Sequence, residues 1–452
     1  MFGNILNYIL GLGAAIFLPI IMIIIGLIIK MKFKRALISG LTLGVAFTGM
    51  NVVLGFMFDT ISPVASAFVE KTGIQLNIID VGWSPMSAIA WAWPYALFMF
   101  PLQIGINLLM LFFKQTDILN VDLWNVWGKI FTATMVAAIT GNIMLGFVAA
   151  AIQVIVELKI GEATQKRTQE ITGIPGVTCT HYMTLQCVIM EPVNKLLDYI
   201  PLFKKENANA DKLKDKIGIF GENSVMGFII GGLIAILAGY SVKDTLNVAI
   251  KVGTALVLFP MVAKLFMQAL APIADAASEF MKSKFKDREI YIGLDWPFMA
   301  GQSELWVVAI LLVPIELLLA VVLSKMGISN VLPLAGIVNV VVVVPAMIVS
   351  KKNLLKMLIL SILYTPIYLL VSSSFAPYAT ELAKTTKAIE IPAGQMITYF
   401  GVEAPFFRWA IANGLAAKIP GIIALVLFFG LFYIFVKNMK RVLLSKLLKY
   451  LF

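Results

Sequence analysis

The chain has 452 residues, of which 60% are hydrophobic and only 13% are charged, and its formal net charge is +11. A soluble globular domain is about half apolar and about a quarter charged, so this composition excludes an ordinary soluble protein. The positive charge does not indicate nucleic-acid binding, because lysines and arginines accumulate in the cytoplasmic loops of membrane proteins. We therefore expect a polytopic protein of the lipid bilayer with no nucleic-acid partner.

Hydrophobic runs recur along the whole chain. Many are 18 or more residues long, which is enough to cross about 30 Å of hydrocarbon as a helix. They predict an all-α membrane protein with about eleven transmembrane helices, some of them half-spans or parts of re-entrant hairpins. In chain order the runs are 5–30, 36–58, 85–113, 130–156, 174–192, 222–240, 246–268, 303–323, 331–350, 354–375 and 419–436.

Basic residues cluster after odd-numbered runs. The clusters lie in residues 30–35, 204–216, 282–288, 351–356 and 437–449. Loops rich in lysine and arginine stay on the cytoplasmic side of a membrane. The pattern thus predicts a multi-pass protein of the cytoplasmic membrane, with its N-terminus outside and its C-terminus in the cytoplasm.

The two halves of the chain repeat one another at a nearly constant spacing, which grows only at loops. Examples are the pairs Pro63/Pro272, Trp83/Trp296 and Tyr182/Tyr399 (272 − 63 = 209, 296 − 83 = 213, 399 − 182 = 217). Such self-similarity predicts homologous halves. Because each half has five spans, an odd number, the second half is expected to be inverted, as in many transporters.

This repeat predicts the domain organisation. Residues 1–215 form the first half with spans 1–5 and a linker, and residues 216–416 form the second half with spans 6–10. Residues 417–452 supply a last transmembrane helix and a basic cytoplasmic tail.

Five stretches interrupt the hydrophobic pattern with glycine, proline and polar residues. They are 80–94, 120–127, 174–186, 293–306 and 399–414. Irregular backbone is tolerated at membrane depth only where protein buries it or where it lines a watery cavity. We expect these stretches to form re-entrant hairpins around a substrate site near the middle of the bilayer.

These stretches contain the candidate substrate-binding residues. A carboxylate that faced lipid would cost at least about 2.5–3.5 kcal/mol, so a functional role is the natural hypothesis for it. Carboxylates and amides can pair with hydroxyl groups, and a tryptophan offers a flat apolar face to the C–H side of a sugar. The set predicts a neutral polyhydroxy ligand and comprises Asp80, Trp83, Asp122, Asn125, His181, Asp295 and Glu403.

Structural explanations remain open for the same residues. The tryptophans are also typical of the membrane interface. Glu403 and Arg408 can form a structural ion pair, Asp80 can lie in a wet extracellular loop, and His181 can be a hydrogen-bonded core residue.

Several absences bear on function. There is no G-x-x-x-x-G-K-[ST] loop for nucleotide hydrolysis and no nucleophile–base pair, so no catalytic residue is expected. One histidine without a thiolate pair or a carboxylate cluster does not predict a metal site, and no cofactor is expected. Cys179 and Cys187 are interpreted as buried, inert residues. Energy for transport must then come from an ion gradient or from partner proteins.

Four short runs resemble one known family. "DVGW" (80–83), "NVDLWNVW" (120–127), "IGLD" (292–295) and "EAP" (403–405) resemble the galactitol-type enzyme IIC permease components of the bacterial phosphoenolpyruvate-dependent sugar phosphotransferase system, in the ascorbate/galactitol superfamily. The resemblance implies a homodimer with a core domain that carries the sugar and a second domain that forms the dimer contact. It also implies that a phosphocysteine on the IIB protein, supplied through IIA, HPr and enzyme I, phosphorylates the sugar.

The sequence therefore predicts a permease subunit that binds a polyol or hexitol, galactitol-like, outside the cell. It would carry this substrate to the cytoplasmic face for phosphorylation by IIB. The alternative is an ion-coupled secondary transporter of a small polar solute with the same inverted repeat.

Overall fold

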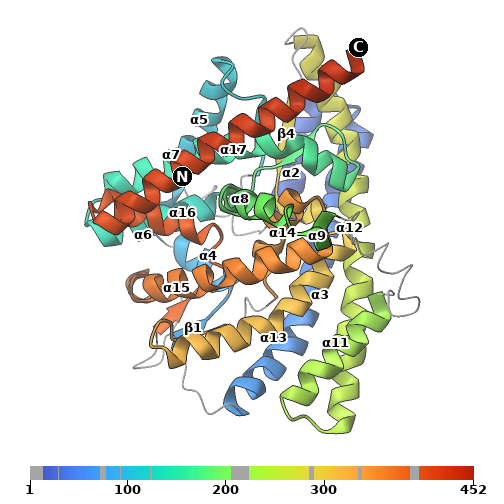
Figure 1. The fold of residues 1–452 in the computed structure, drawn as a ribbon. Helices are drawn as coiled ribbons and strands as arrows, with labels where there is room; N and C mark the ends of the chain where they lie inside the picture. Colours follow the sequence, from blue (N-terminus) through green and yellow to red (C-terminus); the bar gives the residue numbers. More distant parts are fainter. Residues whose placement is uncertain are drawn as a thin grey trace.

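The computed structural model describes residues 14–28, 30–71, 78–91, 93–122, 125–204, 223–284, 290–333, 338–386 and 396–451. The predicted boundary at residues 215 and 216 lies outside them. Four helices among the described residues are long and apolar enough to cross a bilayer, namely Ile143–Thr172, Ser303–Lys325, Leu354–Thr385 and Ile419–Met439. The protein is mostly helical, and these four apolar helices indicate a membrane protein (Figure 1).

The helices have the following bounds in chain order. They are α2 (Ala14–Ile28), α3 (Phe33–Lys71), α4 (Trp83–Trp91), α5 (Met99–Phe112), α6 (Val126–Thr140), α7 (Ile143–Thr172), α8 (Cys187–Leu197), α9 (Pro201–Lys204), α11 (Asn223–Leu237), α12 (Val242–Lys284), α13 (Ser303–Lys325), α14 (Val340–Ser350), α15 (Leu354–Thr386), α16 (Pro405–Leu415) and α17 (Ile419–Leu451). Short 3-10 helices are η1 (Ala96–Phe98), η2 (Tyr182–Gln186) and η4 (Trp296–Met299).

Some hydrophobic runs are broken where a single helix was expected. The run 130–156 is divided between α6 and α7, so the prediction of one continuous crossing there is wrong. Gly141 ends α6 with a φ of 67°, a left-handed conformation that favours glycine. Asn142 then caps α7 by accepting the backbone N–H groups of Met144 and Leu145. The break depends on one glycine and one asparagine inside a mostly apolar run.

The prediction of an all-α fold is wrong in one respect, because two small parallel sheets lie inside the helical protein. Sheet A has the order β5 (Val331–Leu332), β1 (Ile78–Asp80), β6 (Met396–Thr398). Sheet B has the order β2 (Ile118–Asn120), β4 (Tyr291–Leu294), β3 (Val177–Cys179). Strands of two to four residues are too short to show a period-2 pattern in a sequence, so no sequence signal announced them.

The strand order joins distant parts of the chain. In sheet A, Ile78 pairs with Val331 and Met396. In sheet B, Ile292 pairs with Leu119 and Val177. The central strand of each sheet thus comes from one half of the sequence and both outer strands come from the other. Since the strands are parallel, their carboxyl ends meet at one edge of each sheet.

The helices α3 and α12 pack along each other in opposite directions. Gly49 in the middle of α3 lies against Val262 in the middle of α12, whereas Lys71 at the end of α3 lies beside Gly239, just before α12 begins. Together with α2 and α11 they form a group of helices at one side of the molecule, on the right in Figure 1.

A buried glutamine replaces a hydrogen bond that a proline removes. Pro345 lies inside α14 and has no N–H, so the carbonyl of Val341 loses its helical partner. Gln186 Nε2 donates to that carbonyl at 2.8 Å, and the Tyr368 hydroxyl donates to Gln186 Oε1 at 2.7 Å. The contact fixes η2 between α14 and α15.

The substitution Gln186→Leu is expected to lower the free energy of unfolding by about 1–3 kcal/mol, because it leaves the buried Val341 carbonyl and Tyr368 hydroxyl unpaired. Thermal unfolding of the detergent-solubilised protein measures this loss. The control is the same substitution in a Pro345→Ala background, where residue 345 regains an N–H and the loss should be smaller. An equal loss in both backgrounds would show that Gln186 does not act through the proline gap.

Candidate functional site

The edge strand β2 is held by amide side chains. Asn107 on α5 donates from Nδ2 to the Ile118 carbonyl at 2.7 Å and accepts the Asn120 N–H at 2.9 Å. Asn120 Oδ1 in turn accepts the Asp122 N–H at 2.9 Å and the Thr180 hydroxyl at 3.0 Å. These bonds take the place of a fourth strand and set the course of the chain into Asp122.

Asp122 and Asn125 form one hydrogen-bonded unit just before α6. Asn125 donates to the Asp122 carboxylate from its backbone N–H at 3.2 Å and from Nδ2 at 2.8 Å. Trp127 Nε1 donates to Asn125 Oδ1 at 3.2 Å, which fixes the amide orientation. Both Asp122 and Asn125 are buried. The structure thus brings together two of the residues that the sequence selected.

His181 faces two carboxylates that come from the other half of the chain. Its Nε2 lies 3.8 Å from Asp295 Oδ1 and 3.9 Å from Glu403 Oε1. Its Nδ1 accepts the Met183 N–H at 3.2 Å, so in the neutral ring the proton lies on Nε2 and points toward the carboxylates. Both separations are too long for a direct hydrogen bond, but each can be bridged by one small polar group.

Each of these three residues follows the carboxyl end of a strand. His181 comes two residues after β3, Asp295 directly follows β4, and Glu403 is in the loop after β6. Asp295 Oδ1 accepts the Trp296 N–H at 2.7 Å and so starts η4. The Asp295 carboxylate also interacts electrostatically with the Asn125 amide and the Asp122 carboxylate. The Asp122–Asn125 unit and the His181 group are therefore parts of one polar site.

Glu403 and Arg408 do not form the ion pair considered from the sequence. Among their contacts, Glu403 Oε1 accepts the Tyr399 hydroxyl at 2.9 Å, whereas Arg408 Nη2 donates to the Gly128 carbonyl at 3.1 Å. The buried guanidinium of Arg408 lies 4.7 Å from the ring centre of Tyr182. Tyr182 also stacks on His181 with 4.1 Å between ring centres. Arg408 thus supports the ring that packs against His181.

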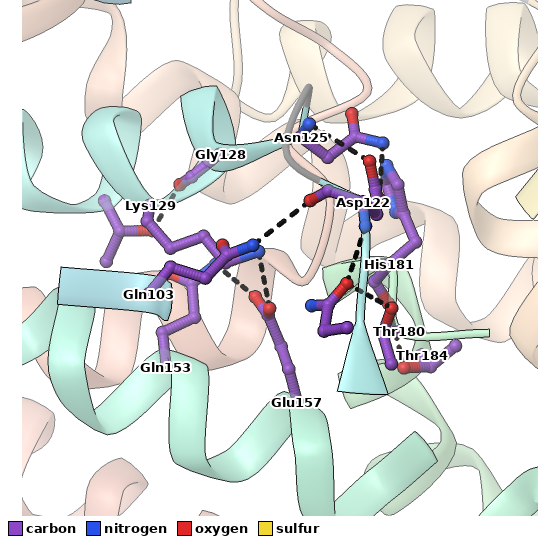
Figure 2. A network of polar contacts seen from close by, with 12 residues as sticks. Gln103, Asp122, Asn125, Gly128, Lys129, Gln153, Glu157, Thr180, His181 and Thr184 are labelled. Carbon is purple, nitrogen blue, oxygen red and sulfur yellow. Dashed lines mark hydrogen bonds and ion pairs between the residues drawn. The ribbon is translucent and has the colours of Figure 1, made fainter. Parts of the chain in front are cut away.

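A buried ion pair beside the site was not recognised from the sequence. Lys129 Nζ lies 2.6 Å from Glu157 Oε2, and the two side chains are 2% and 1% exposed. Gln153 Nε2 donates to Glu157 Oε1 at 2.7 Å (Figure 2). The sequence did contain a sign of this pair, because Lys129 and Glu157 flank the apolar run 130–156. A charge at membrane depth needs a partner of opposite sign.

Asp80 and Trp83 lie at sheet A, on the other sheet from His181. Asp80 is only 2% exposed, so the alternative of a wet loop is wrong for this residue. Its Oδ1 accepts the N–H groups of Gly82 at 3.0 Å and Phe400 at 2.9 Å. The carboxylate thereby joins the turn after β1 to the loop that carries Glu403. Trp83 begins α4 and is half-buried against the core.

The site combines one imidazole N–H donor with carboxylate acceptors. Among the described residues no group of three or more His, Cys, Asp or Glu is placed to hold a metal ion. Comparison with known proteins then decides the family. Residues 8–394 match the family EIIC-GAT, described as the sugar-specific permease component of the PTS, the phosphotransferase system. The chain belongs to this family of sugar permeases.

Two relatives have closely similar lengths to this permease. The PTS system galactitol-specific EIIC component of Escherichia coli (strain K12) is 32% identical over 429 residues, which are 94% of this chain and 93% of that protein. The protein of the same name from Escherichia coli O157:H7 gives the same identity and coverage. The resemblance drawn from "DVGW" and "NVDLWNVW" is therefore confirmed at the level of the family.

In this EIIC chain the substitution Gly128→Ala is expected to disturb the site, because a Cβ on Gly128 would overlap the Tyr182 ring that stacks on His181. Overpacking of this kind costs about 1–3 kcal/mol of stability. The matched control is Gly105→Ala, also in a helix, where a Cβ would meet open space. Thermal unfolding compares the variants, and an equal effect of the two would contradict the close packing of Gly128 on Tyr182.

The Lys129–Glu157 pair allows a charge test. Lys129→Met leaves a buried carboxylate without its cation and is expected to cost about 3–5 kcal/mol of stability. The double variant Lys129→Met, Glu157→Leu removes both charges and should recover most of this loss. Chemical unfolding in detergent measures both variants. A double variant as unstable as the single one would mean that packing, and not charge, sets the effect.

Proposed function

We propose that this chain is a permease subunit that binds a polyol or hexitol, galactitol-like, and carries it across the membrane for phosphorylation by a IIB protein. The observation that carries this proposal is the gap between His181 Nε2, Asp295 Oδ1 and Glu403 Oε1, at 3.8 and 3.9 Å from the imidazole nitrogen. A hydroxyl group in the gap accepts a hydrogen bond from the imidazole N–H and donates one to a carboxylate. Only a group that both donates and accepts satisfies all three side chains.

The charges of the site favour a neutral substrate. Asp122, Asp295 and Glu403 contribute three carboxyl groups. The cations nearby are Arg408, which packs on the Tyr182 ring, and Lys129, which is paired with Glu157. An anionic sugar would meet like charges, which is an effective way to reject a ligand. A polyol instead offers several O–H donors to these acceptors. Asp80 and Trp83, which lie at sheet A, are proposed to form the far wall of the same pocket.

The proposed transport cycle rests on an inverted repeat, with halves 1–215 and 216–416 and a last helix with tail in 417–452. Two observations support it. Each sheet takes its central strand from one half and its outer strands from the other. The helices α3 and α12, which correspond at the spacing of 209 residues (242 − 33 = 209), pack in opposite directions. Two inverted halves that meet at a site allow access from either side of the membrane in turn.

The proposed assembly is a homodimer in the cytoplasmic membrane. Its N-termini are outside and its C-termini are in the cytoplasm. The group α2, α3, α11 and α12 is the candidate for the dimer-forming domain, because the residues of the site come from other elements. The basic cytoplasmic loops would attract the phosphorylated IIB protein, which receives its phosphoryl group through IIA, HPr and enzyme I. A dianionic sugar phosphate does not return through hydrocarbon, so phosphorylation makes uptake one-way.

Uptake of labelled hexitols by cells that contain the other phosphotransferase proteins tests this function. His181→Ala removes one partner of the bridging hydroxyl, and Asp295→Asn removes the negative charge of another. Each is expected to weaken apparent affinity about tenfold or more, since a hydrogen bond to a charged group contributes about 1.5–3 kcal/mol. Asp244→Asn, at the exposed start of α12, is the control and should transport normally.

Unchanged affinity in both site variants would remove these residues from the pocket. The alternative, an ion-coupled transporter, predicts uptake into sealed vesicles that needs an ion gradient and no phosphoenolpyruvate.

A further inference from the structure

A second pair of buried polar side chains lies at sheet A, outside the site described above. Glu316 projects from α13, within the apolar helix Ser303–Lys325, and Asn339 directly precedes α14. Both residues are 0% exposed. Asn339 Nδ2 donates to Glu316 Oε1 at 3.2 Å. Nothing in the proposed transport cycle uses this pair.

Glu316 has no countercharge among the described residues. Glu157 is a useful comparison, because it is equally buried and also accepts a hydrogen bond from a side-chain amide. Unlike Glu316, it has a countercharge, since Lys129 Nζ lies 2.6 Å from Glu157 Oε2. The charged group that acts on Glu316 is Asp80 at the end of β1, which would repel a carboxylate. Tyr368 on α15 is the other titratable group that faces it. The described parts of α3, α11 and α12 that pack on α13 contribute no ion pair to it.

Two atoms of the pair have no hydrogen-bond partner. They are Glu316 Oε2 and Asn339 Oδ1, both acceptors when the carboxyl group is ionised and both buried. A buried acceptor without a donor costs about 1–3 kcal/mol, and an unpaired buried carboxylate costs more. One proton on Oε2 removes the charge, and a turn of the two planar groups toward each other lets that O–H donate to Oδ1. The acid and the amide then share two hydrogen bonds in one ring.

We propose that Glu316 and Asn339 form a proton-binding site, in which Glu316 keeps its proton in the folded protein and pairs with Asn339 through two hydrogen bonds. The ligand of this site is a proton and not a metal cation. Loss of the proton would set two negative charges, Glu316 and Asp80, against each other. Because Asp80 accepts a hydrogen bond from the Phe400 N–H, this repulsion acts on the loop that carries Glu403. Deprotonation thus loosens one wall of the sugar site, a consequence that rests on the proposed function.

The test uses the purified full-length chain and the variant Glu316→Gln, whose amide reproduces both hydrogen bonds without a titratable proton. Infrared spectra are recorded in H2O and D2O at neutral pH. The difference spectrum of wild type minus Glu316→Gln should show the C=O band of one buried protonated carboxylic acid. Glu157→Gln is the control and should retain the Glu316 band, because it leaves Glu316 and Asn339 unchanged. Absence of this band from the difference spectrum would overturn the proposal.

Thermal unfolding against pH gives a second readout that needs no substrate. The folded state binds one proton more than the unfolded state above the range where free glutamate titrates, so stability must fall as pH rises. The wild type should therefore lose stability relative to Glu316→Gln as pH rises. The difference between their unfolding midpoints should grow from about pH 6 to about pH 9, with the variant higher. Parallel curves would overturn the proposal.

Replacing sodium by choline separates a proton from a metal cation at the same site. The expected result is an unchanged midpoint for both proteins. A midpoint that rises with sodium in the wild type only would show an ionised Glu316 holding a cation, and would also overturn the proposal. Failure of the proposed sugar transport leaves all three readouts unaffected, so the two proposals can be judged separately.

Discussion

The structure depends on one constraint: polar groups that lie away from water must find partners inside the protein. Irregular backbone and buried amides are expensive at membrane depth, where no solvent can pair with them. The chain meets this need largely with glutamine and asparagine side chains. Asn107 supports the edge of sheet B, and Gln186 pairs with the carbonyl that Pro345 leaves free. These amides allow broken helices and short strands to exist within an apolar interior.

The two sheets are the means by which distant residues meet. Each strand is only two to four residues long, and its partners lie in the other half of the sequence. Parallel pairing brings the carboxyl ends of the strands to one edge, and the candidate residues stand just beyond these ends. His181 thus meets Asp295, which is more than a hundred residues away in the chain. The helices serve mainly to bury this arrangement and to hold it in the membrane.

Charges are treated in two different ways inside the protein. Lys129 and Glu157 are paired directly at 2.6 Å, and Gln153 satisfies a further acceptor. His181 and its two carboxylates are instead held nearly 4 Å apart, too far for a direct hydrogen bond between them. Paired charges stabilise the fold around the site. The proposed substrate site rests on this separation.

The sequence by itself determined the class of the protein, its family and the stretches in which polar residues gather, because composition and run length record the solvent around each segment. It also selected Asp122, Asn125, His181, Asp295 and Glu403, which the tertiary structure joins in one polar site. Only the tertiary structure decided which of these residues contact each other and that Asp80 holds the Phe400 loop at the other sheet. It also revealed both sheets and the break at Gly141. These features depend on partners far apart in the chain and on strands too short to show a period, so no local pattern could reveal them.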